Sequence, residues 1–192
     1  MEKIDGPKIE LAVGLVHYPI LDRAGTTVAT NVTNFDIHDI ARACRVYGVS
    51  DYFIIHPGRE QLMFVSRVLD HWRTGPGSRM NPKRKTALGP VKTAESLEEA
   101  LSLWGRKDAA VVATHAREKD KYEGYTFRQM REELPKRPHF LVFGTGFGLA
   151  ESVFESCTHL LEPIRGAPPE DYRHLSVRSA VSICLDRLRG AW

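Results

Sequence analysis

Two stretches near the end of this chain decide its fold: residues 141–149, Leu-Val-Phe-Gly-Thr-Gly-Phe-Gly-Leu, and residues 174–182, His-Leu-Ser-Val-Arg-Ser-Ala-Val-Ser. The first reads as an apolar strand that runs into a glycine turn, and the second as a helix capped by Ser176. Gly144, Gly146 and Gly148 remove side chains where the backbone must bend sharply or approach a ligand closely. Together the two stretches predict a nucleotide-type cofactor site built late in the chain.

The composition indicates a globular protein of one domain, residues 1–192. The chain is 42% hydrophobic and 27% charged, with a net charge of +3. We find no apolar run long enough to span a membrane and no signal-peptide pattern, so we expect no membrane association. Cys44, Cys157 and Cys184 are widely separated and odd in number, which predicts reduced thiols in a cytoplasmic protein. No spacing of His and Cys suits a metal, and we expect none.

One segment concentrates positive charge. Between Arg73 and Lys92 the sequence has six basic residues and no acidic one. Its prolines and glycines favour a loop over a helix. We therefore expect a basic loop at about residues 73–92, which either contacts RNA phosphates or only aids solubility.

The rest of the chain alternates apolar strand patterns with amphipathic helix patterns. This alternation predicts an α/β fold with a mainly parallel sheet flanked by helices. The expected strands are 9–16, 51–56, 109–114, 139–143 and 159–162. The expected helices are 36–47, 60–72, 94–104, 149–156 and 176–189.

The glycine turn also has a rival interpretation as a dinucleotide-binding fingerprint, with Glu162 near the distance of a ribose-binding acid. However, its spacing is Gly-x-Gly-x-Gly, and only about a quarter of the chain follows it, whereas a dinucleotide fold begins with the motif. An NAD-dependent oxidoreductase is therefore the weaker alternative. A third interpretation gives the glycines no role beyond a tight turn.

Three segments, read in order, resemble the SPOUT (trefoil-knot) RNA methyltransferases. Residues 30–49 (TNVTNFDIHDIARACRVYGV) are similar to the first motif of that family, in which an Asn opens a helix that carries an Arg. Residues 141–150 (LVFGTGFGLA) resemble the second motif. Residues 159–166 (HLLEPIRG) and 175–181 (LSVRSAV) resemble the segment before the knot and the third motif.

The resemblance is strongest to a bacterial branch related to the tRNA guanine-N1 methyltransferases. It implies an enzyme that uses S-adenosylmethionine (SAM) to methylate RNA, either tRNA or rRNA. It also implies a deep trefoil knot at about residues 141–192 and a homodimer that pairs the first and last helices. In that dimer, RNA and cofactor contacts from two subunits share one cleft.

The motif match assigns residues to roles. The implied cofactor-binding residues are Thr114, Phe143, Gly144, Thr145, Gly146, Gly148, Leu161, Glu162, Ile164, Gly166, His174, Leu175, Ser176 and Ala180. Arg42 is the implied catalytic or RNA-orienting residue, and Asp36 and Asp39 are candidates for accepting a proton. The expected RNA-binding residues are Asn31, Asn34, Arg73, Arg79, Lys83, Arg84 and Lys85.

The sequence also departs from the family pattern. Asp36 stands where the first motif has an Asn, and His38 where it has a Gly. The second motif lacks the Glu of 2′-O-methylating members, and Ser176 and Arg178 replace the Asn and Ser of the third. These departures keep open a second function class, a non-catalytic RNA-binding relative that retains the SAM pocket, and leave the methylated atom unassigned.

Overall fold

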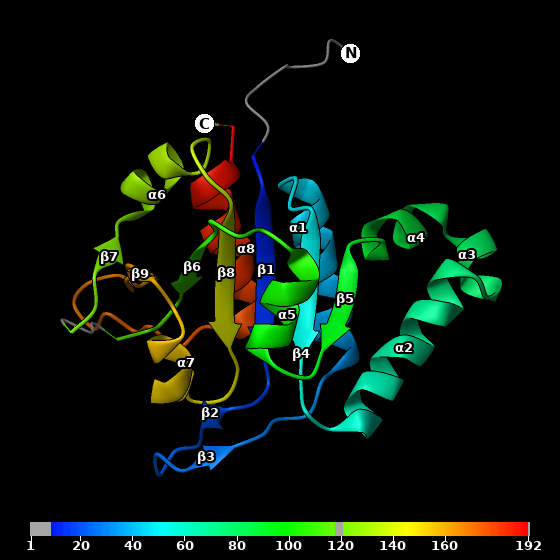
Figure 1. Cartoon of the computed structure of the whole chain (residues 1–192), viewed down its shortest axis with the longest axis horizontal. Coiled ribbons are helices and arrows are strands. Elements are labelled where there is room, and N and C mark those ends of the chain that lie inside the picture. Colours follow the sequence, from blue (N-terminus) through cyan, green and yellow to red (C-terminus); the bar gives the residue numbers. More distant parts are fainter. Residues whose placement is uncertain (1–8, 118–120, 192) are drawn as a thin grey trace.

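The fold is built on one parallel sheet. The computed structural model describes residues 9–117 and 121–191, and within them seven strands pair in the order β5-β4-β1-β8-β6-β9-β7, each parallel to its neighbours (Figure 1). The strands are β1 (Leu11–Val16), β4 (Asp51–Ile55), β5 (Val91–Ala94), β6 (Ala110–Ala113), β7 (Gly124–Tyr125), β8 (His139–Gly144) and β9 (His159–Leu161). This sheet confirms the predicted α/β class.

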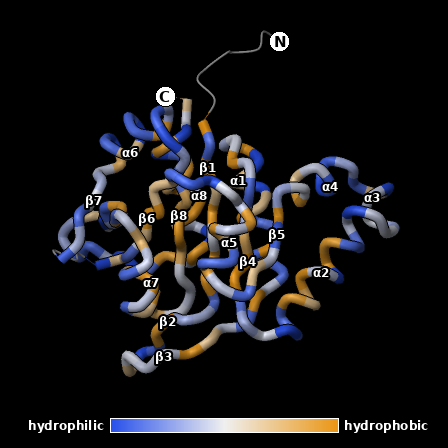
Figure 2. Tube along the Cα trace, viewed as in Figure 1, coloured by the Kyte–Doolittle hydropathy of each residue, from blue (hydrophilic) through white to orange (hydrophobic). Residues whose placement is uncertain are grey.

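Helices cover both faces of the sheet, so the molecule has three layers (Figure 1). One face carries η1 (Asp36–Ile40), α1 (Ala41–Val46), α2 (Arg59–Arg73), α6 (Phe127–Glu133) and α8 (Val177–Arg189), and the other carries α5 (Leu97–Trp104) and α7 (Glu151–Glu155). The buried side chains of β1 alternate between the two cores, with Leu11, Val13 and Leu15 on the first face and Ala12 and Val16 on the second. Figure 2 shows the central strands as the most hydrophobic part of the chain.

The expected basic loop is wrong, because residues 73–92 form regular structure. They contain α3 (Pro76–Met80), α4 (Pro82–Leu88) and the start of β5. Pro76 and Pro82 occupy first-turn positions of the two helices, where a missing N–H is tolerated and the fixed φ suits a helix. Asn81 caps α4 by accepting a hydrogen bond from the Arg84 N–H at 3.0 Å. The prolines that argued for a loop therefore start helices instead.

Other expected elements shift at their ends. The helix expected at 94–104 is the end of β5 followed by α5, which Ser96 caps. The helix expected at 36–47 begins with π-helical geometry. Its start is held by a reciprocal pair, in which Asp36 accepts from the Thr33 N–H at 3.0 Å and Thr33 Oγ1 accepts from the Asp36 N–H at 3.2 Å.

A short hairpin was not expected between β1 and η1. Its antiparallel strands are β2 (Ile20–Leu21) and β3 (Thr27–Val28). The Leu21 N–H donates to the Gly148 carbonyl at 2.8 Å, and the Phe147 N–H donates to the Leu21 carbonyl at 3.0 Å. The hairpin therefore docks on the glycine turn that follows β8.

Three further expectations can be compared with the described residues. All three cysteines are free thiols. Within residues 9–117 and 121–191, no cluster of three His, Cys, Asp or Glu side chains could hold a metal. Over the same ranges, no helix combines the length and apolar character needed to cross a bilayer.

Candidate cofactor and acceptor site

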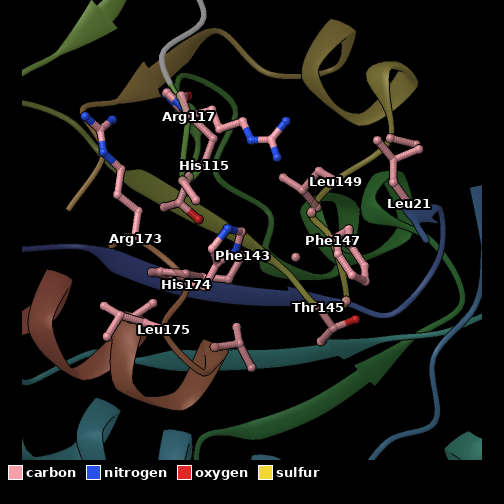
Figure 3. Close-up of a pocket in the computed structure, with 18 of the residues that line it drawn as sticks. Leu21, His115, Arg117, Phe143, Thr145, Phe147, Leu149, Arg173, His174 and Leu175 are labelled. Carbon is pink, nitrogen blue, oxygen red and sulfur yellow. The ribbon is translucent and has the colours of Figure 1, made fainter. Parts of the chain in front are cut away.

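A cavity of about 840 Å³ opens beside the carboxyl ends of β6 and β8 (Figure 3). Five segments line it: the β2–β3 hairpin, the loop after β6, the glycine turn, α7, and residues 162–184. Ligands of open parallel sheets bind at the carboxyl ends of the strands, so the position suits a cofactor. The structure brings the following predicted cofactor residues to this cavity: Thr114, Phe143, Gly144, Thr145, Gly146, Gly148, Glu162, Ile164, His174, Leu175, Ser176 and Ala180.

Two predicted cofactor residues do not line the cavity. Leu161 is buried in β9, where its backbone pairs with Tyr125 of β7. Gly166 faces its own loop, because an added Cβ would lie 2.5 Å from backbone atoms of Tyr172. Direct contact with a ligand therefore stays a prediction for the other twelve residues and loses support for these two.

The glycine turn needs its glycines for different reasons. Gly146 and Gly148 have φ values of +58° and +109°, a region that disfavours residues with a Cβ. An added Cβ at Gly146 would lie 2.9 Å from Ile20 Cδ1 and 3.1 Å from the Leu21 carbonyl oxygen, so it meets the hairpin. At Gly148, which lines the cavity, the same atom would meet nothing within 4 Å. Gly146 therefore secures the hairpin, whereas Gly148 leaves open space beside a ligand.

The start of α8 forms the opposite wall. Ser176 Oγ accepts from the Ser179 N–H at 3.2 Å and so caps the helix, as predicted. Leu175 and Ser176, just before the helix, are exposed and line the cavity. Cys184, one turn after Ala180, lines it too, and burial raises the pKa of this thiol to about 12, so it stays protonated.

These walls fit SAM by shape and chemistry. The cavity is large enough for a cofactor of nucleotide size, and backbone groups of the glycine turn and of residues 162–176 border it. When bound, SAM supplies an activated methyl group, so the chain itself has to bind and orient the reactants and remove a proton.

The carboxylate of Glu162 already has a partner. Its Oε1 accepts from the Phe127 N–H at 2.6 Å, at the N-terminus of α6. A carboxylate at this position stabilises the helix through its exposed N–H groups. Glu162, which the dinucleotide interpretation assigned to ribose binding, therefore stabilises the start of α6.

A buried polar chain lies behind the glycine turn. Nδ1 of His17 is 3.0 Å from Thr30 Oγ1, which is 2.5 Å from Thr145 Oγ1 at the cavity. His17 is 1% exposed, and burial lowers its pKa from 6.5 to about 4, while the nearby Asp36 opposes the shift and His56 adds to it. Neutral His17 therefore joins the end of β1, the segment between the hairpin and η1, and the glycine turn.

His17 should make the protein sensitive to mild acid. Because its pKa in the folded state lies below the unfolded value, the unfolded chain binds the proton first as the pH falls from 6.5 towards 4. We expect this to lower the free energy of unfolding by about 3 kcal/mol over that range. His17→Asn keeps a hydrogen-bonding group for Thr30 but cannot titrate. Denaturant titrations from pH 7 to 4 should thus show that the free energy of unfolding depends less on pH in the variant than in the wild type. An equal pH dependence in the two proteins would contradict this role.

The candidate catalytic residues lie outside the main cavity. Asp36 is 6% exposed and accepts from the Thr33 backbone and hydroxyl groups, whereas Asp39 is exposed on η1. Arg178 of α8 pairs with both, at 3.9 Å from Asp36 and 3.2 Å from Asp39. Arg42 is exposed on α1 and shares a shallow groove with Asp39, Val46, Tyr47 and Ser182. One subunit therefore does not gather these residues around the cofactor cavity.

The predicted RNA-binding residues divide into two groups. The guanidinium of Arg73 is partly buried and donates to the carbonyls of Leu88, Gly89 and Val91 at 2.6–3.1 Å, so Arg73 holds α2 to β5. Arg84 lies over the ring of Trp72 at 4.6 Å. The residues with exposed side chains are Asn31, Asn34, Arg79, Lys83 and Lys85, and Asn31 accepts a bond from Gln61.

Sequence reasoning missed several residues of the site. Leu21, Asp22 and Arg23 of the hairpin line the cavity, as do Arg117 and Phe147. The hairpin strands are two residues long, which is too short for an alternating apolar pattern to predict them. The best available signal for the hairpin was Asp22, because an Asp-x-x-Gly pattern, here Asp22 to Gly25, is typical of a turn.

Comparison with known proteins agrees with this geometry. A family model described as SAM-dependent RNA methyltransferase matches residues 10–190. The chain belongs to this family. The predicted family is thereby confirmed, and the oxidoreductase alternative is set aside.

Curated relatives align with nearly the whole chain. The tRNA (guanine-N(1)-)-methyltransferase of Nitratidesulfovibrio vulgaris is 40% identical over 187 residues, which are 96% of this chain and 43% of that protein. This chain thus spans less than half the length of that relative.

Two solved structures share the fold. A methylase family protein from Neisseria gonorrhoeae has a TM-score of 0.66 at 18% identity, covering 100% of this chain and 86% of its own. The SpoU methyltransferase AviRb from Streptomyces viridochromogenes, solved with AdoMet, has a TM-score of 0.54 at 15% identity, covering 98% and 61%. At these identities the likeness shows the fold alone.

Proposed function

We propose that this methyltransferase transfers the methyl group of SAM to tRNA. The observation that carries the proposal is the cavity itself, which gathers residues from the loop after β6, the glycine turn and the start of α8, where the family resemblance expects the cofactor. The tRNA substrate is supported by the name of the N. vulgaris relative, although that protein is more than twice as long.

Two measurements test this proposal. Calorimetric titration should show SAM binding to the purified chain and no binding of NAD. Mass spectrometry of nucleosides from a strain that lacks the gene should then show one methylated nucleoside lost from the tRNA fraction. Loss from rRNA alone would replace tRNA as the substrate, and SAM binding without any lost nucleoside would favour the non-catalytic relative.

We assign Arg42 to the acceptor and Asp39 to proton removal. Arg42 is exposed, and its planar fork suits a phosphate or an acceptor base. Asp39 is the better of the two acids, because Asp36 is buried and already accepts two hydrogen bonds from Thr33. A base nitrogen would need such a general base, whereas the methylated atom itself is not assigned.

A homodimer would bring these residues to a cofactor cavity of the partner subunit. Phe35 and Val46 are 63% and 75% exposed on the η1–α1 surface, next to Arg178 and Ser182 of α8. Large apolar side chains exposed together are typical of an interface. The family resemblance expects pairing through these same helices, which supports the dimer.

We expect light scattering at micromolar concentration to give twice the chain mass of 21.7 kDa. Val46→Glu should place a charge in the interface and shift the mass to that of one chain. Leu103→Glu is the matched control, because Leu103 is 55% exposed on α5, on the other face of the sheet, and should stay dimeric. A wild-type mass of one chain would contradict the dimer.

The helices α3 and α4 are proposed to bind RNA phosphates through Arg79, Lys83 and Lys85. Neutralising all three to Gln should weaken tRNA binding and lower the salt dependence of log Kd by ~0.7 to 0.9 per lost contact. SAM affinity should not change, because none of the three lines the cavity. Arg106→Gln, on the other side of the sheet and paired with Glu10, removes one charge and is the control for each single Gln variant. Unchanged tRNA affinity would leave these residues a role in solubility only.

The trefoil knot remains part of this proposal. SPOUT-type neighbours imply that the chain after Leu141 threads a loop, up to Trp192, which lies outside the described residues. The single shared sheet supports one domain for residues 1–192. An experimental structure in which α8 packs on the sheet without threading would contradict the knot. A cytoplasmic location is also a proposal, and fractionation would test it.

A further inference from the structure

The glycine turn presents an aromatic ring to the cavity. Phe147 lies between Gly146 and Gly148, which both have positive φ values and form the tight turn around it. Its N–H is tied to the Leu21 carbonyl, yet its side chain is 61% exposed and lines the cavity (Figure 3). A ring that is fixed through its backbone but not buried offers a flat apolar face to a ligand.

Three arginines border the same cavity, of which Arg173 pairs with Asp171. Arg23 lies at the tip of the β2–β3 hairpin and Arg117 lies in the loop after β6. Among the residues that the structure describes, neither guanidinium makes a hydrogen bond or ion pair. Both side chains are exposed, so their charges are available to a ligand.

The acids of the cavity make their hydrogen bonds to other groups, and among the described residues none of them forms an ion pair with Arg23 or Arg117. Asp22 accepts from the N–H groups of Ala24 and Thr26, both at 2.8 Å. Glu162 caps α6, and Glu151 accepts from the Tyr122 hydroxyl at 2.5 Å. The wall made by Arg23 and Arg117 therefore attracts anions.

The cofactor does not account for this wall. Phe147 belongs to the second motif, but neither it nor Arg23 or Arg117 is among the residues that the motif match assigns to SAM. The sulfonium of SAM is a cation, and SAM carries only one carboxylate, so it offers a single anionic group to two guanidinium groups. A nucleotide within an RNA chain is complementary to all three side chains. Its base has a flat π face for the ring of Phe147, and a phosphate lies on each side of its ribose for the two guanidinium groups.

We propose that Phe147, Arg23 and Arg117 form the subsite for the acceptor nucleotide, which shares the cavity with the cofactor. The ring of Phe147 stacks on a base of the RNA, and the two guanidinium groups bind its flanking phosphates. This inference rests on the proposed function, because it deepens the RNA-binding part of the same site. It makes the β2–β3 hairpin a part of substrate recognition.

Matched variants separate the ring from the bulk of Phe147. Phe147→Ala removes the side chain, Phe147→Leu keeps apolar volume without a ring, and Phe147→Trp restores a ring. Arg23→Gln and Arg117→Gln remove one charge each. Arg128→Gln is the charge control, because Arg128 is exposed on α6 and does not line the cavity. The probe is unfractionated tRNA from a strain of the source organism that lacks the gene.

We expect Phe147→Ala and Phe147→Leu each to weaken tRNA binding by about 5- to 100-fold, and Phe147→Trp to restore it. Each Arg→Gln change should lower the salt dependence of log Kd by ~0.7 to 0.9. The calorimetric Kd for SAM should stay within about twofold of wild type for every variant, as should both affinities of Arg128→Gln.

Three outcomes would overturn the subsite. If SAM affinity falls while tRNA affinity holds, these residues bind the cofactor. If Phe147→Leu binds tRNA as well as wild type, the ring does not stack. If no variant differs from Arg128→Gln in tRNA affinity or salt dependence, Phe147, Arg23 and Arg117 do not bind RNA. Failure of the wild type to bind SAM or to methylate this tRNA would instead refute the proposed function, so the two failures are distinguishable.

Discussion

Gly146→Val should abolish SAM binding. A β-branched residue at a φ of +58° costs about 1–2 kcal/mol, and its Cβ would meet Ile20 and Leu21, so the turn and the hairpin must separate. Thr145 would move with the turn and break its link to Thr30. We expect the calorimetric Kd for SAM to rise by about 100-fold or more.

Gly105→Val provides the matched control for Gly146→Val. Gly105 has a φ of +70° at the end of α5, and an added Cβ would meet only the Ser102 carbonyl at 3.9 Å. The variant should lose stability by a similar backbone penalty yet bind SAM as wild type does. If Gly146→Val binds SAM normally while the glycine turn stays folded, the turn does not border the cofactor and its assignment has to be withdrawn.

Arg42→Ala should separate binding from methyl transfer. Arg42 lies outside the cofactor cavity, so SAM affinity should stay near that of wild type. The rate of methyl transfer to tRNA should fall by about a hundredfold or more, because misplacing an acceptor by about 1 Å has an effect of this size. Single-turnover rates with saturating SAM measure the loss.

Arg45→Ala tests whether the loss is specific to Arg42. Both arginines are exposed on α1, three residues apart, and their removal changes the net charge equally. We expect Arg45→Ala to retain transfer. Normal activity of Arg42→Ala, or equal losses in the two variants, would end the assignment of Arg42 to the acceptor.

The sheet could be predicted from the sequence because its strands carry strong local signals. Residues such as Val111 and Val112 sit in continuous apolar runs, which are typical of parallel strands buried on both faces. The hairpin carried no such signal, since its strands are too short for a period. The segment 73–92 was misread because Pro and Gly were counted as breakers without asking which of them begins a helix.

The site could be predicted only in part, for a physical reason. Motif resemblance identified segments that the fold brings to one cavity, but the roles of single side chains depend on contacts distant in sequence. Arg73 illustrates this, because its charge suggested RNA whereas its guanidinium binds carbonyls 15 to 18 residues later in the chain. The role of His17 likewise depends on its burial and on its link to Thr30, which no local pattern indicates.

The parallel pairing of β1 has a consequence for synthesis of the protein. One edge of β1 pairs with β4, but the other pairs with β8, whose His139 lies opposite Leu11. At ordinary elongation rates, the ribosome needs on the order of ten seconds to add the intervening residues. During that time a strand with no polar side chain offers open N–H and C=O groups to any neighbouring chain. The nascent polypeptide is therefore most prone to aggregate before β8 emerges, and a chaperone that shields β1 would act in this interval.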